Sequence, residues 1–336
     1  MGGLLELRDL TVELPTAAGW VRPVNSVSLA VAEGETLGIV GESGSGKTML
    51  SLALMGLTPP GARPTGEAWL AGRSAANGSA GANGAAARRN LVTANAAEMR
   101  AVRGGEIGMI FQEPMTALNP VMRIGSQIEE AIRVHQPDAT SAAIERRALE
   151  SMERAAIPNA AIRAHQYPHQ LSGGLRQRAM IAMALAPGPR LLIADEPTTA
   201  LDVTVQKQIL DVLVELRREL RLGMLFITHD LGVVAQVADR VAVMYAGRVV
   251  EEGFSGNVLH RPQHPYTEGL LRAAPRLERG RLTPIPGTVP PLDRLPAGCA
   301  FGPRCGYHRA ECDAAVPDLR AASETHRARC VLVPRT

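Results

Sequence analysis

One stretch near the start of the chain has the residue types of a phosphate-binding loop. Residues 41–48 read GESGSGKT, which fits the pattern G-x-x-x-x-G-K-[ST] in full. Glycines let a backbone approach phosphate oxygens and turn several N–H groups inward. Lys47 would reach the β- and γ-phosphates as a compact charge, and the Thr48 hydroxyl would bind Mg²⁺. The sequence therefore predicts a nucleoside triphosphate site, whose candidate residues are Gly41, Ser43, Gly44, Ser45, Gly46, Lys47 and Thr48.

A second stretch, LLIADEP at residues 191–197, supplies two carboxylates. Its four apolar residues predict a buried strand, and ligands of open α/β sheets bind at the carboxyl ends of such strands. Asp195 suits the ligand shell of Mg²⁺, and Glu196 suits a general base that acts on an attacking water. Taken alone, the stretch is more typical of a solvated acidic turn, but the phosphate-binding loop upstream favours the catalytic interpretation.

The third stretch, LSGGLRQR at residues 171–178, predicts a helix start. Ser172 is a good N-cap, and Gly173 and Gly174 open the helix. A helix N-terminus lined with glycine is a second site that suits an anion.

Four cysteines lie close to the end of the sequence, at Cys299, Cys305, Cys312 and Cys330, and residues 1–298 contain none. They lack the tight C-x₂₋₄-C pair that is typical of zinc sites, and a cytosolic compartment disfavours disulfides. Buried free thiols are the plainest alternative. A short segment rich in Pro, Gly and Arg often needs a metal staple, however, and four thiolates suit either zinc or an iron–sulfur cluster. The residues themselves leave these three possibilities open.

The elements that must position these residues alternate between strands and helices. A helix is expected over residues 48–57, after the phosphate-binding loop. Alternation of this kind indicates an α/β fold with a mostly parallel sheet. The expected strands are 36–40, 106–111, 190–196, 223–228 and 241–247.

The length of 336 residues suggests about two domains. We expect a nucleotide-binding domain over residues 1–255, with a mainly helical part at about 114–170. An Ala/Gly/Asn/Ser-rich stretch at about 74–93 predicts a flexible surface insertion. From residue 256 the composition shifts to proline and arginine, so residues 256–336 are expected to form a distinct extension and not more of the sheet.

Composition narrows the function classes. The net charge of +3 argues neither for nor against nucleic acid, and 3% aromatic residues disfavour stacking on single strands. Glu6, Arg8 and Asp9 interrupt any signal-peptide core, and no apolar run approaches the roughly 20 residues of a membrane span. We expect a cytoplasmic protein that reaches a membrane only through a partner.

The order of the motifs resembles that of the ATP-binding subunits of ABC transporters, over roughly residues 4–255. Between and after the stretches above come Phe111–Gln112, ALD at 200–202 and THD at 228–230. The resemblance implies a RecA-like P-loop NTPase core with an antiparallel β subdomain and a helical subdomain. In this family two ATPase domains pack head to tail, and each ATP lies between the P-loop of one and the LSGG of the other. That arrangement would explain two anion sites in one chain.

The resemblance also implies roles for single residues. Gln112 is similar to the glutamine that touches Mg²⁺ and water and marks the docking region for the membrane subunits. The LSGG residues would hold the partner's γ-phosphate, and Asp202 would lie at the dimer interface. His229 is similar to the switch histidine that contacts the γ-phosphate. Trp20 is the candidate for stacking on adenine, with an exposed hairpin aromatic as the alternative.

A narrower resemblance is to the dipeptide/oligopeptide importer ATPases, as the D-type member of a D/F pair. It is carried by FQEPMTALNP, HPYTEGLL at 264–271, and IPGTVPPL followed by GCAFGPRC. Members of this subfamily hold a [4Fe–4S] cluster on four cysteines at the matching positions. The resemblance therefore favours an iron–sulfur cluster with a structural role, with zinc as the alternative.

Taken together, the resemblance implies an ATP hydrolase that uses Mg²⁺ and powers import of di- or oligopeptides or a related small solute. It would sit peripherally on the cytoplasmic side of the membrane. The implied partners are a second, homologous ATPase subunit, two transmembrane permeases and a substrate-binding protein, with no nucleic acid. An exporter ATPase is the nearer alternative. A soluble ABC ATPase acting on nucleic acid is disfavoured, because the chain has one P-loop and no heptad run. Nickel, opines and glutathione are handled by relatives too, so the substrate stays open.

Overall fold

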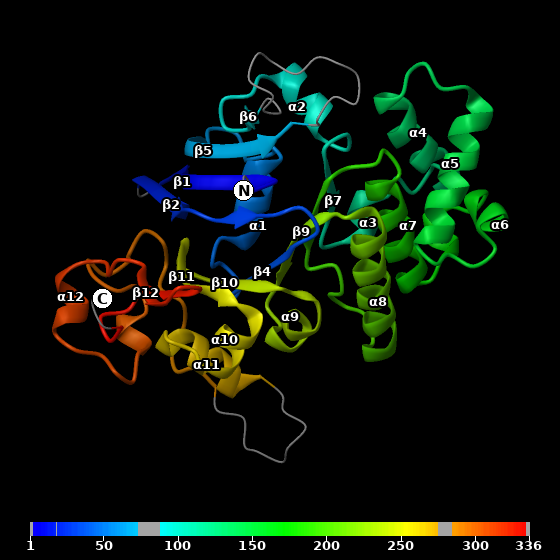
Figure 1. The fold of residues 1–336 in the computed structure, drawn as a ribbon. Helices are drawn as coiled ribbons and strands as arrows, with labels where there is room; N and C mark the ends of the chain where they lie inside the picture. Colours follow the sequence, from blue (N-terminus) through cyan, green and yellow to red (C-terminus); the bar gives the residue numbers. More distant parts are fainter. Residues whose placement is uncertain (1–2, 18, 73–87, 275–283, 334–336) are drawn as a thin grey trace. The chain divides into compact units, whose positions relative to one another are not determined.

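The computed structural model describes residues 3–17, 19–72, 88–274 and 284–333, which form two compact units (Figure 1). The first unit contains Met1–Val31, Thr36–Thr93 and Phe226–Thr336, and the second contains Ala32–Glu35 and Ala94–Leu225. Most of the expected surface insertion, residues 73–87, lies outside the described residues. The last part of that stretch forms strand β6 (Arg88–Asn90).

The first unit begins with an antiparallel sheet of order β2-β1-β5-β6, with β3 also paired to β1. Buried side chains alternate along β1, as expected for a strand with one covered face. The alternation changes phase at Asp9, which has a φ of 47°, and the register against β5 shifts there. A bulge of this kind lets both ends of a long strand bury their apolar residues. The strands are β1 (Leu5–Thr16), β2 (Gly19–Val27), β3 (Ala30–Val31), β5 (Arg63–Ala71) and β6.

The second sheet of the first unit is built around parallel strands. β4 pairs in parallel with β10, and β10 pairs antiparallel with β11. The order within the unit is β12-β13-β11-β10-β4-β9. The elements are β4 (Thr36–Val40), α1 (Lys47–Leu54), β9 (Gly223–Thr228), α9 (Leu231–Val237), β10 (Arg240–Tyr245), β11 (Arg248–Phe254), α10 (Ser255–His260), α11 (Pro265–Ala273), η2 (Gly302–Arg304), α12 (Glu311–Ala314), β12 (Arg320–Ser323) and β13 (His326–Ala328).

The C-terminal residues differ from the expectation that they add nothing to the sheet. β13 pairs with β11 through Glu251↔Ala328 and Gly253↔His326, and β12 pairs with β13. The pairing satisfies backbone groups of β11 that a bare edge would leave open. The buried Glu251 also bonds the His326 ring, with Oε1 and Nε2 2.7 Å apart.

The extension also shares a hydrophobic core with the parallel strands. Tyr245 of β10, Tyr266 of α11 and Phe301 pack as three rings whose centroids lie 4.6–5.4 Å apart. Tyr245 and Tyr266 are essentially fully buried. Because Val40 at the end of β4 belongs to the same core, the extension is packed next to the strand that leads into the P-loop.

The second unit combines the start of β9 with parallel strands β8 and β7 and a group of helices. All five residues of β8 are buried, as its apolar run predicts. Residues 114–170 form only helices and connecting turns. The elements are α2 (Ala96–Val102), β7 (Ile107–Ile110), α3 (Pro114–Ala117), α4 (Ile124–His135), α5 (Ser141–Arg154), α6 (Ala160–Ala164), η1 (Pro168–Gln170), α7 (Gly173–Leu185), β8 (Leu191–Asp195) and α8 (Val203–Leu220).

The predicted α/β class with parallel strands and an additional antiparallel sheet is confirmed. Within the described part of the chain, no helix is both long and apolar enough to cross a membrane.

Candidate nucleotide-binding site

The P-loop lies in the first unit, between β4 and α1, as predicted. Two of its glycines are required by the surrounding backbone. A Cβ on Gly41 would lie 2.2 Å from the Met244 carbonyl oxygen, and one on Gly46 would lie 1.9 Å from the Pro23 carbonyl oxygen. Gly46 also has a φ of 102°, which only glycine adopts without strain. The rest of the unit therefore fixes the path of this loop.

Lys47 begins α1 and curls back over the loop. Its Nζ donates to the carbonyl oxygens of Gly41 (2.7 Å) and Glu42 (3.0 Å), and the side chain is buried. Ser45 is fully buried, while Ser43, Gly44 and Thr48 are exposed. The ammonium is thus held against the loop, beside the backbone N–H groups that would face phosphate oxygens.

Glu42 is a loop residue whose contacts the sequence does not reveal. Its carboxylate receives two hydrogen bonds from the guanidinium of Arg304, and its backbone N–H donates to the Tyr266 hydroxyl. The sequence does give one indication, because a carboxylate such as Glu42 inside an anion-binding loop is expected to have a cation nearby. Nothing in the sequence says which of its arginines that is.

Two further candidates of the first unit are exposed. Trp20 on β2 is 45% exposed, and the guanidinium of Arg63 lies 3.9 Å from its ring centroid. Cation–π packing therefore covers one face of the indole. His229 directly follows β9, where the next residue, Asp230, caps α9 through the N–H groups of Gly232 and Val233.

In the second unit, the candidate base lies beside the candidate glutamine. Asp195 is the buried last residue of β8, and Glu196 follows with a φ of 47°. The Gln112 amide donates to Glu196 Oε2 at 3.3 Å, and the Thr199 hydroxyl donates to the same oxygen at 2.8 Å. The fold thus brings together residues 84 positions apart in the sequence, and two donors orient the carboxylate.

The LSGG stretch begins α7, as predicted. The Ser172 hydroxyl accepts from the Leu175 N–H at 3.4 Å, and Ser172 and Gly173 are exposed. A Cβ on Gly174 would lie 2.6 Å from Val205 Cγ1, whereas one on Gly173 would meet only Leu201, at 3.8 Å. Close packing therefore accounts for Gly174, but nothing within the described residues requires a glycine at 173.

Asp202 acts locally as the N-cap of α8. Its Oδ1 accepts from the N–H groups of Thr204 (3.1 Å) and Val205 (3.0 Å). This is the ordinary capping role of an aspartate, and it holds the carboxylate at the start of the helix.

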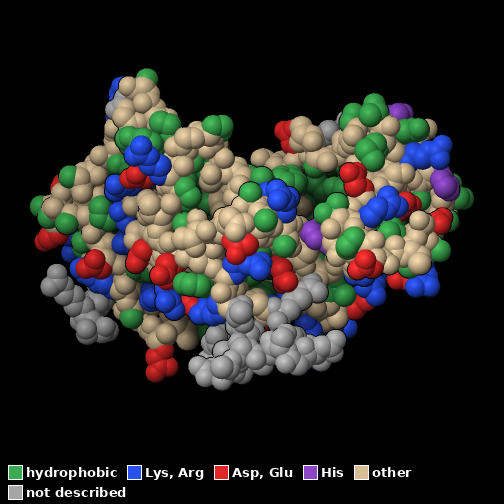
Figure 2. Space-filling view, turned by 90° about the horizontal axis from the view of Figure 1, so that it is seen from above, with side chains coloured by type: hydrophobic (Ala, Val, Ile, Leu, Met, Phe, Trp, Pro, Cys, Tyr) green, Lys and Arg blue, Asp and Glu red, His purple; other side chains and the backbone are tan. Residues whose placement is uncertain are grey.

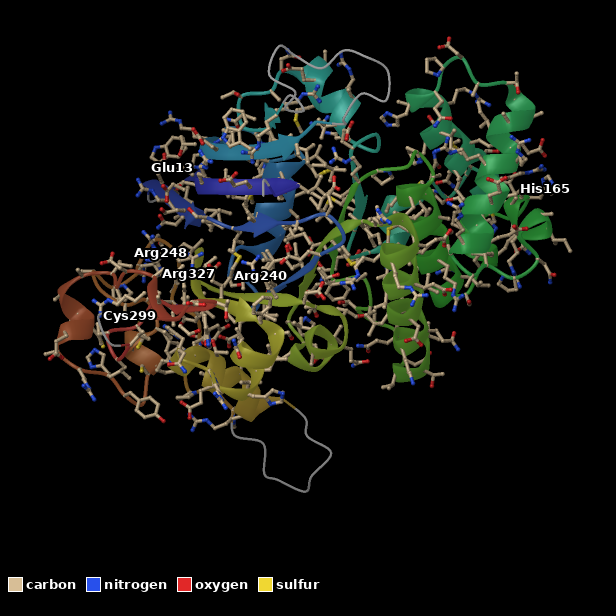
Figure 3. All side chains as sticks on the ribbon, in the orientation of Figure 1. Glu13, His165, Arg240, Arg248, Cys299 and Arg327 are labelled. Atoms are coloured by element: carbon tan, nitrogen blue, oxygen red, sulfur yellow. The ribbon has the colours of Figure 1, made fainter. Side chains whose placement is uncertain are left out.

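The four cysteines line one small cavity, together with His264 and Phe301 among others. Cys312 and Cys330 are buried, and Cys299 and Cys305 are half-buried. Figure 3 labels Cys299 in the C-terminal part of the chain. The fold therefore places Cys330 on the same cavity as the other three cysteines, although it lies well after Cys312 in the sequence.

Thiols are suitable metal ligands, but other features of this cavity do not favour metal binding. Burial raises the pKa of the Cys299, Cys305 and Cys330 thiols, and backbone N–H groups such as that of Leu332 partly offset this by bonding the sulfurs. Among the described residues, however, no group of three or more His, Cys, Asp or Glu side chains is arranged to hold a metal ion. The thiols as they stand therefore do not form a ready-made site for the expected iron–sulfur cluster or zinc.

Surface charge is mixed on the face drawn in Figure 2, where basic and acidic side chains are interspersed among the described residues. A broad basic face is the usual footprint of duplex binding. The view adds nothing in favour of nucleic acid as a partner.

Two parts of the chain match known protein families. Residues 24–199 match the family described as ABC transporter. Residues 250–312 match the oligopeptide/dipeptide transporter C-terminal region. The second match lies within the extension and the strand that leads into it.

Curated relatives match nearly the whole chain. A putative peptide import ATP-binding protein of Brucella ovis is 50% identical, covering 98% of this chain and 96% of its own length. The oligopeptide transport ATP-binding protein OppD of Bacillus subtilis is 47% identical, covering 96% of this chain and 87% of its own. The dipeptide transport ATP-binding protein DppD of the same organism is 44% identical, with 99% and 95% covered.

A solved structure shares the fold. It is a dimeric ATP-binding cassette in a post-hydrolysis state bound to ADP and Pi, 27% identical, with a TM-score of 0.63, covering 75% of this chain and 98% of that one. The predicted family resemblance and fold class are confirmed by these matches.

Proposed function

The chain belongs to the ABC transporter family, and we propose that it is the ATP-hydrolysing subunit that powers import of di- or oligopeptides, or of a related small solute. One observation carries the proposal. A complete set of nucleotide motifs is followed, in the same chain, by the C-terminal region of oligopeptide/dipeptide transporters. The first part supplies the ATPase, and the second indicates the kind of transporter.

The proposed chemistry gives each motif a separate role. The P-loop N–H groups and Lys47 would bind the β- and γ-phosphates, and the Thr48 hydroxyl and the Asp195 carboxylate would supply the oxygen ligands that Mg²⁺ prefers. Mg²⁺, when bound, would neutralise charge on the phosphates. Glu196 orients and deprotonates the attacking water, and Gln112 and Thr199 hold its carboxylate in place. His229 contacts the γ-phosphate.

The second anion site serves a neighbouring ATPase subunit. Ser172, Gly173 and Gly174 would contact the γ-phosphate bound to the P-loop of that subunit, with Asp202 at the interface. Support comes from the exposure of Ser172 and Gly173. Trp20 would stack on adenine with the indole face that Arg63 leaves open.

The remaining proposed partners follow from the transporter class. They are a homologous ATPase subunit, forming a heterodimer, two permeases that contact the region of Gln112, and a substrate-binding protein. The chain would then lie peripherally on the cytoplasmic side of the membrane. An exporter ATPase is not favoured, because residues 250–312 match the C-terminal region of oligopeptide/dipeptide transporters and a relative that matches nearly the whole chain is named for peptide import.

We further propose that the four cysteines hold a metal group, a [4Fe–4S] cluster in preference to zinc. Support comes from the kind of donor and from the convergence of all four thiols on one cavity. The sulfurs would have to move to bind it, because no metal-binding arrangement is present among the described residues. Anaerobically purified protein should absorb broadly near ~400 nm, and Cys305→Ser should abolish that absorbance. Colourless protein with stoichiometric zinc, or with no metal, contradicts the cluster.

The transport proposal is tested by reconstitution. The chain, its partner ATPase and the two permeases are assembled in proteoliposomes, and uptake of labelled peptides, nickel chelates and glutathione is compared. We expect ATP-dependent peptide uptake that is lost when Glu196→Gln is introduced. Uptake of only a non-peptide solute, or efflux in place of uptake, contradicts the proposal.

A further inference from the structure

The P-loop contains a carboxylate that nucleotide binding alone does not explain. Glu42 is the second residue of GESGSGKT, and a negative charge at this position repels the phosphates that the loop must hold. Arg304 forms a two-pronged ion pair with it. Nη1 lies 2.7 Å from Oε2, and Nη2 lies 3.0 Å from Oε1. The Arg304 side chain is 4% exposed and that of Glu42 is 32% exposed, so solvent screens the pair only partly.

Arg304 is held rigidly in the extension. Its Nε donates to the Pro286 carbonyl at 2.9 Å, and its Nη1 also lies 3.3 Å from the Tyr245 hydroxyl. The guanidinium carbon lies 5.8 Å from the ring centroids of Tyr245 and Phe301. The hydrogen bonds to Glu42 raise the pKa of Arg304. The extension therefore presents a permanent, pre-oriented cation to the P-loop.

A second contact holds the backbone of the same residue. The Glu42 N–H donates to the Tyr266 hydroxyl at 2.8 Å. Tyr266 is fully buried at the start of α11, where the His264 ring accepts its N–H. The Glu42 carbonyl in turn accepts from Lys47 Nζ at 3.0 Å. Glu42 is thus held by its side chain and its N–H from the extension, and by its carbonyl from the phosphate-binding lysine.

We propose that Arg304 is a positioning residue for the nucleotide site, through which the C-terminal extension sets the charge and conformation of the P-loop. The inference rests on the proposed binding of ATP by this loop. With Arg304 in place, the guanidinium balances the charge of the Glu42 carboxylate, and the Glu42 carbonyl holds Lys47. Without Arg304, an uncompensated carboxylate stands next to the phosphates. The same short segment carries Cys299 and Cys305, so disorder around these cysteines would displace Arg304 and thereby weaken nucleotide binding.

The test measures MgATP binding to the full chain by titration calorimetry, with a thermal melt of every variant. Arg304→Gln should weaken MgATP binding about tenfold, within the range typical of coupled sites. Adding Glu42→Gln should restore most of the affinity, because the repelling charge is then gone. This recovery distinguishes positioning by charge from a merely structural role, since a second lost contact would otherwise weaken the protein further.

Arg327→Gln is the matched control. Arg327 pairs with Glu252 between β13 and β11, so it also joins the extension to the sheet, and Figure 3 labels it on the same C-terminal part of the chain as Cys299. It should bind MgATP as the wild type does. If Arg304→Gln does not fold, Arg304→Lys decides the question. This variant keeps the charge but loses the fork, and it should bind about threefold more weakly and recover with Glu42→Gln.

Two results overturn the proposal: wild-type affinity in a folded Arg304 variant, or a double variant that binds no better than the single one. Failure of the proposed function looks different. In that case the wild-type chain and Arg327→Gln would themselves bind no MgATP.

Discussion

Two glycine-rich helix starts in this chain are built in different ways. At the start of α1, backbone carbonyls lie where a Cβ would be at Gly41 and Gly46, Lys47 is buried, and Glu42 is held by Arg304 and Tyr266. At the start of α7, a serine caps its own helix, and a Cβ on the exposed Gly173 would meet only the Leu201 side chain, at 3.8 Å. The first start is fixed by its own unit, whereas the second is presented outward.

The difference shows how to separate two reasons for a glycine. A glycine that its own chain requires has a positive φ or a backbone atom where Cβ would be. A glycine with neither, at an exposed helix start, has room for a side chain until something outside the chain approaches. On this basis we expect the P-loop to bind nucleotide through groups of its own chain, and we propose that the LSGG helix serves a partner that approaches it.

The largest expected effect is on the rate of ATP hydrolysis, and it comes from replacing Glu196 of the second unit. Glu196→Gln should lower ATP hydrolysis by the assembled transporter on the order of 10²–10⁴-fold, because the positioned base is lost, while MgATP affinity stays at the wild-type value. Steady-state phosphate release and calorimetric titration measure the two. Wild-type turnover in this variant would remove Glu196 from the mechanism.

Lys47→Ala should show the opposite pattern. Loss of a hydrogen bond to a charged group costs about 1.5–3 kcal/mol, so MgATP affinity should fall about 10- to 100-fold in the isolated chain. The thermal midpoint serves as the control for folding. An unchanged affinity would contradict the assignment, because Lys47 of the P-loop would then not contribute to nucleotide binding.

A smaller effect concerns the support of the P-loop. Burial lowers the pKa of His264, which caps α11 and so places Tyr266, to about 4 from about 6.5. The unfolded chain therefore binds a proton between these values and the folded chain does not, so folding stability is full above pH 6.5 and falls as the pH drops toward 4. From pH 7 to pH 5 the loss from His264 is about 2 kcal/mol.

Urea unfolding at the two pH values measures this loss. His264→Asn keeps a capping acceptor but does not titrate, so its stability should depend less on pH by about that amount. Equal pH dependence in both proteins would show that His264 is not held neutral by the fold.

Sequence patterns predicted the P-loop from GESGSGKT and the β8 strand from its four apolar residues, and the strands β4 and β8 that lead into these motifs are fully buried. They did not predict β12 and β13, because RAAS and HRA are too short for an alternating pattern. Nor did they connect Arg304 to Glu42, which is 262 positions away. The spacing of the cysteines likewise left open whether they bind a cluster, bind zinc or stay free thiols, whereas the fold places all four around one cavity.

The most direct test of the account is Gly173→Ala, measured beside Gly46→Ala. Gly46→Ala should lower the thermal midpoint of the isolated chain, since its Cβ would lie 1.9 Å from a carbonyl oxygen. Gly173→Ala should leave the midpoint and the MgATP affinity unchanged, or slightly raise the midpoint, because alanine favours helix. In the assembled transporter it should lower hydrolysis about 10²-fold, because a methyl group displaces the partner's phosphate. Unimpaired hydrolysis by that assembly, or a destabilised isolated chain, would contradict the claim that this helix start serves a partner.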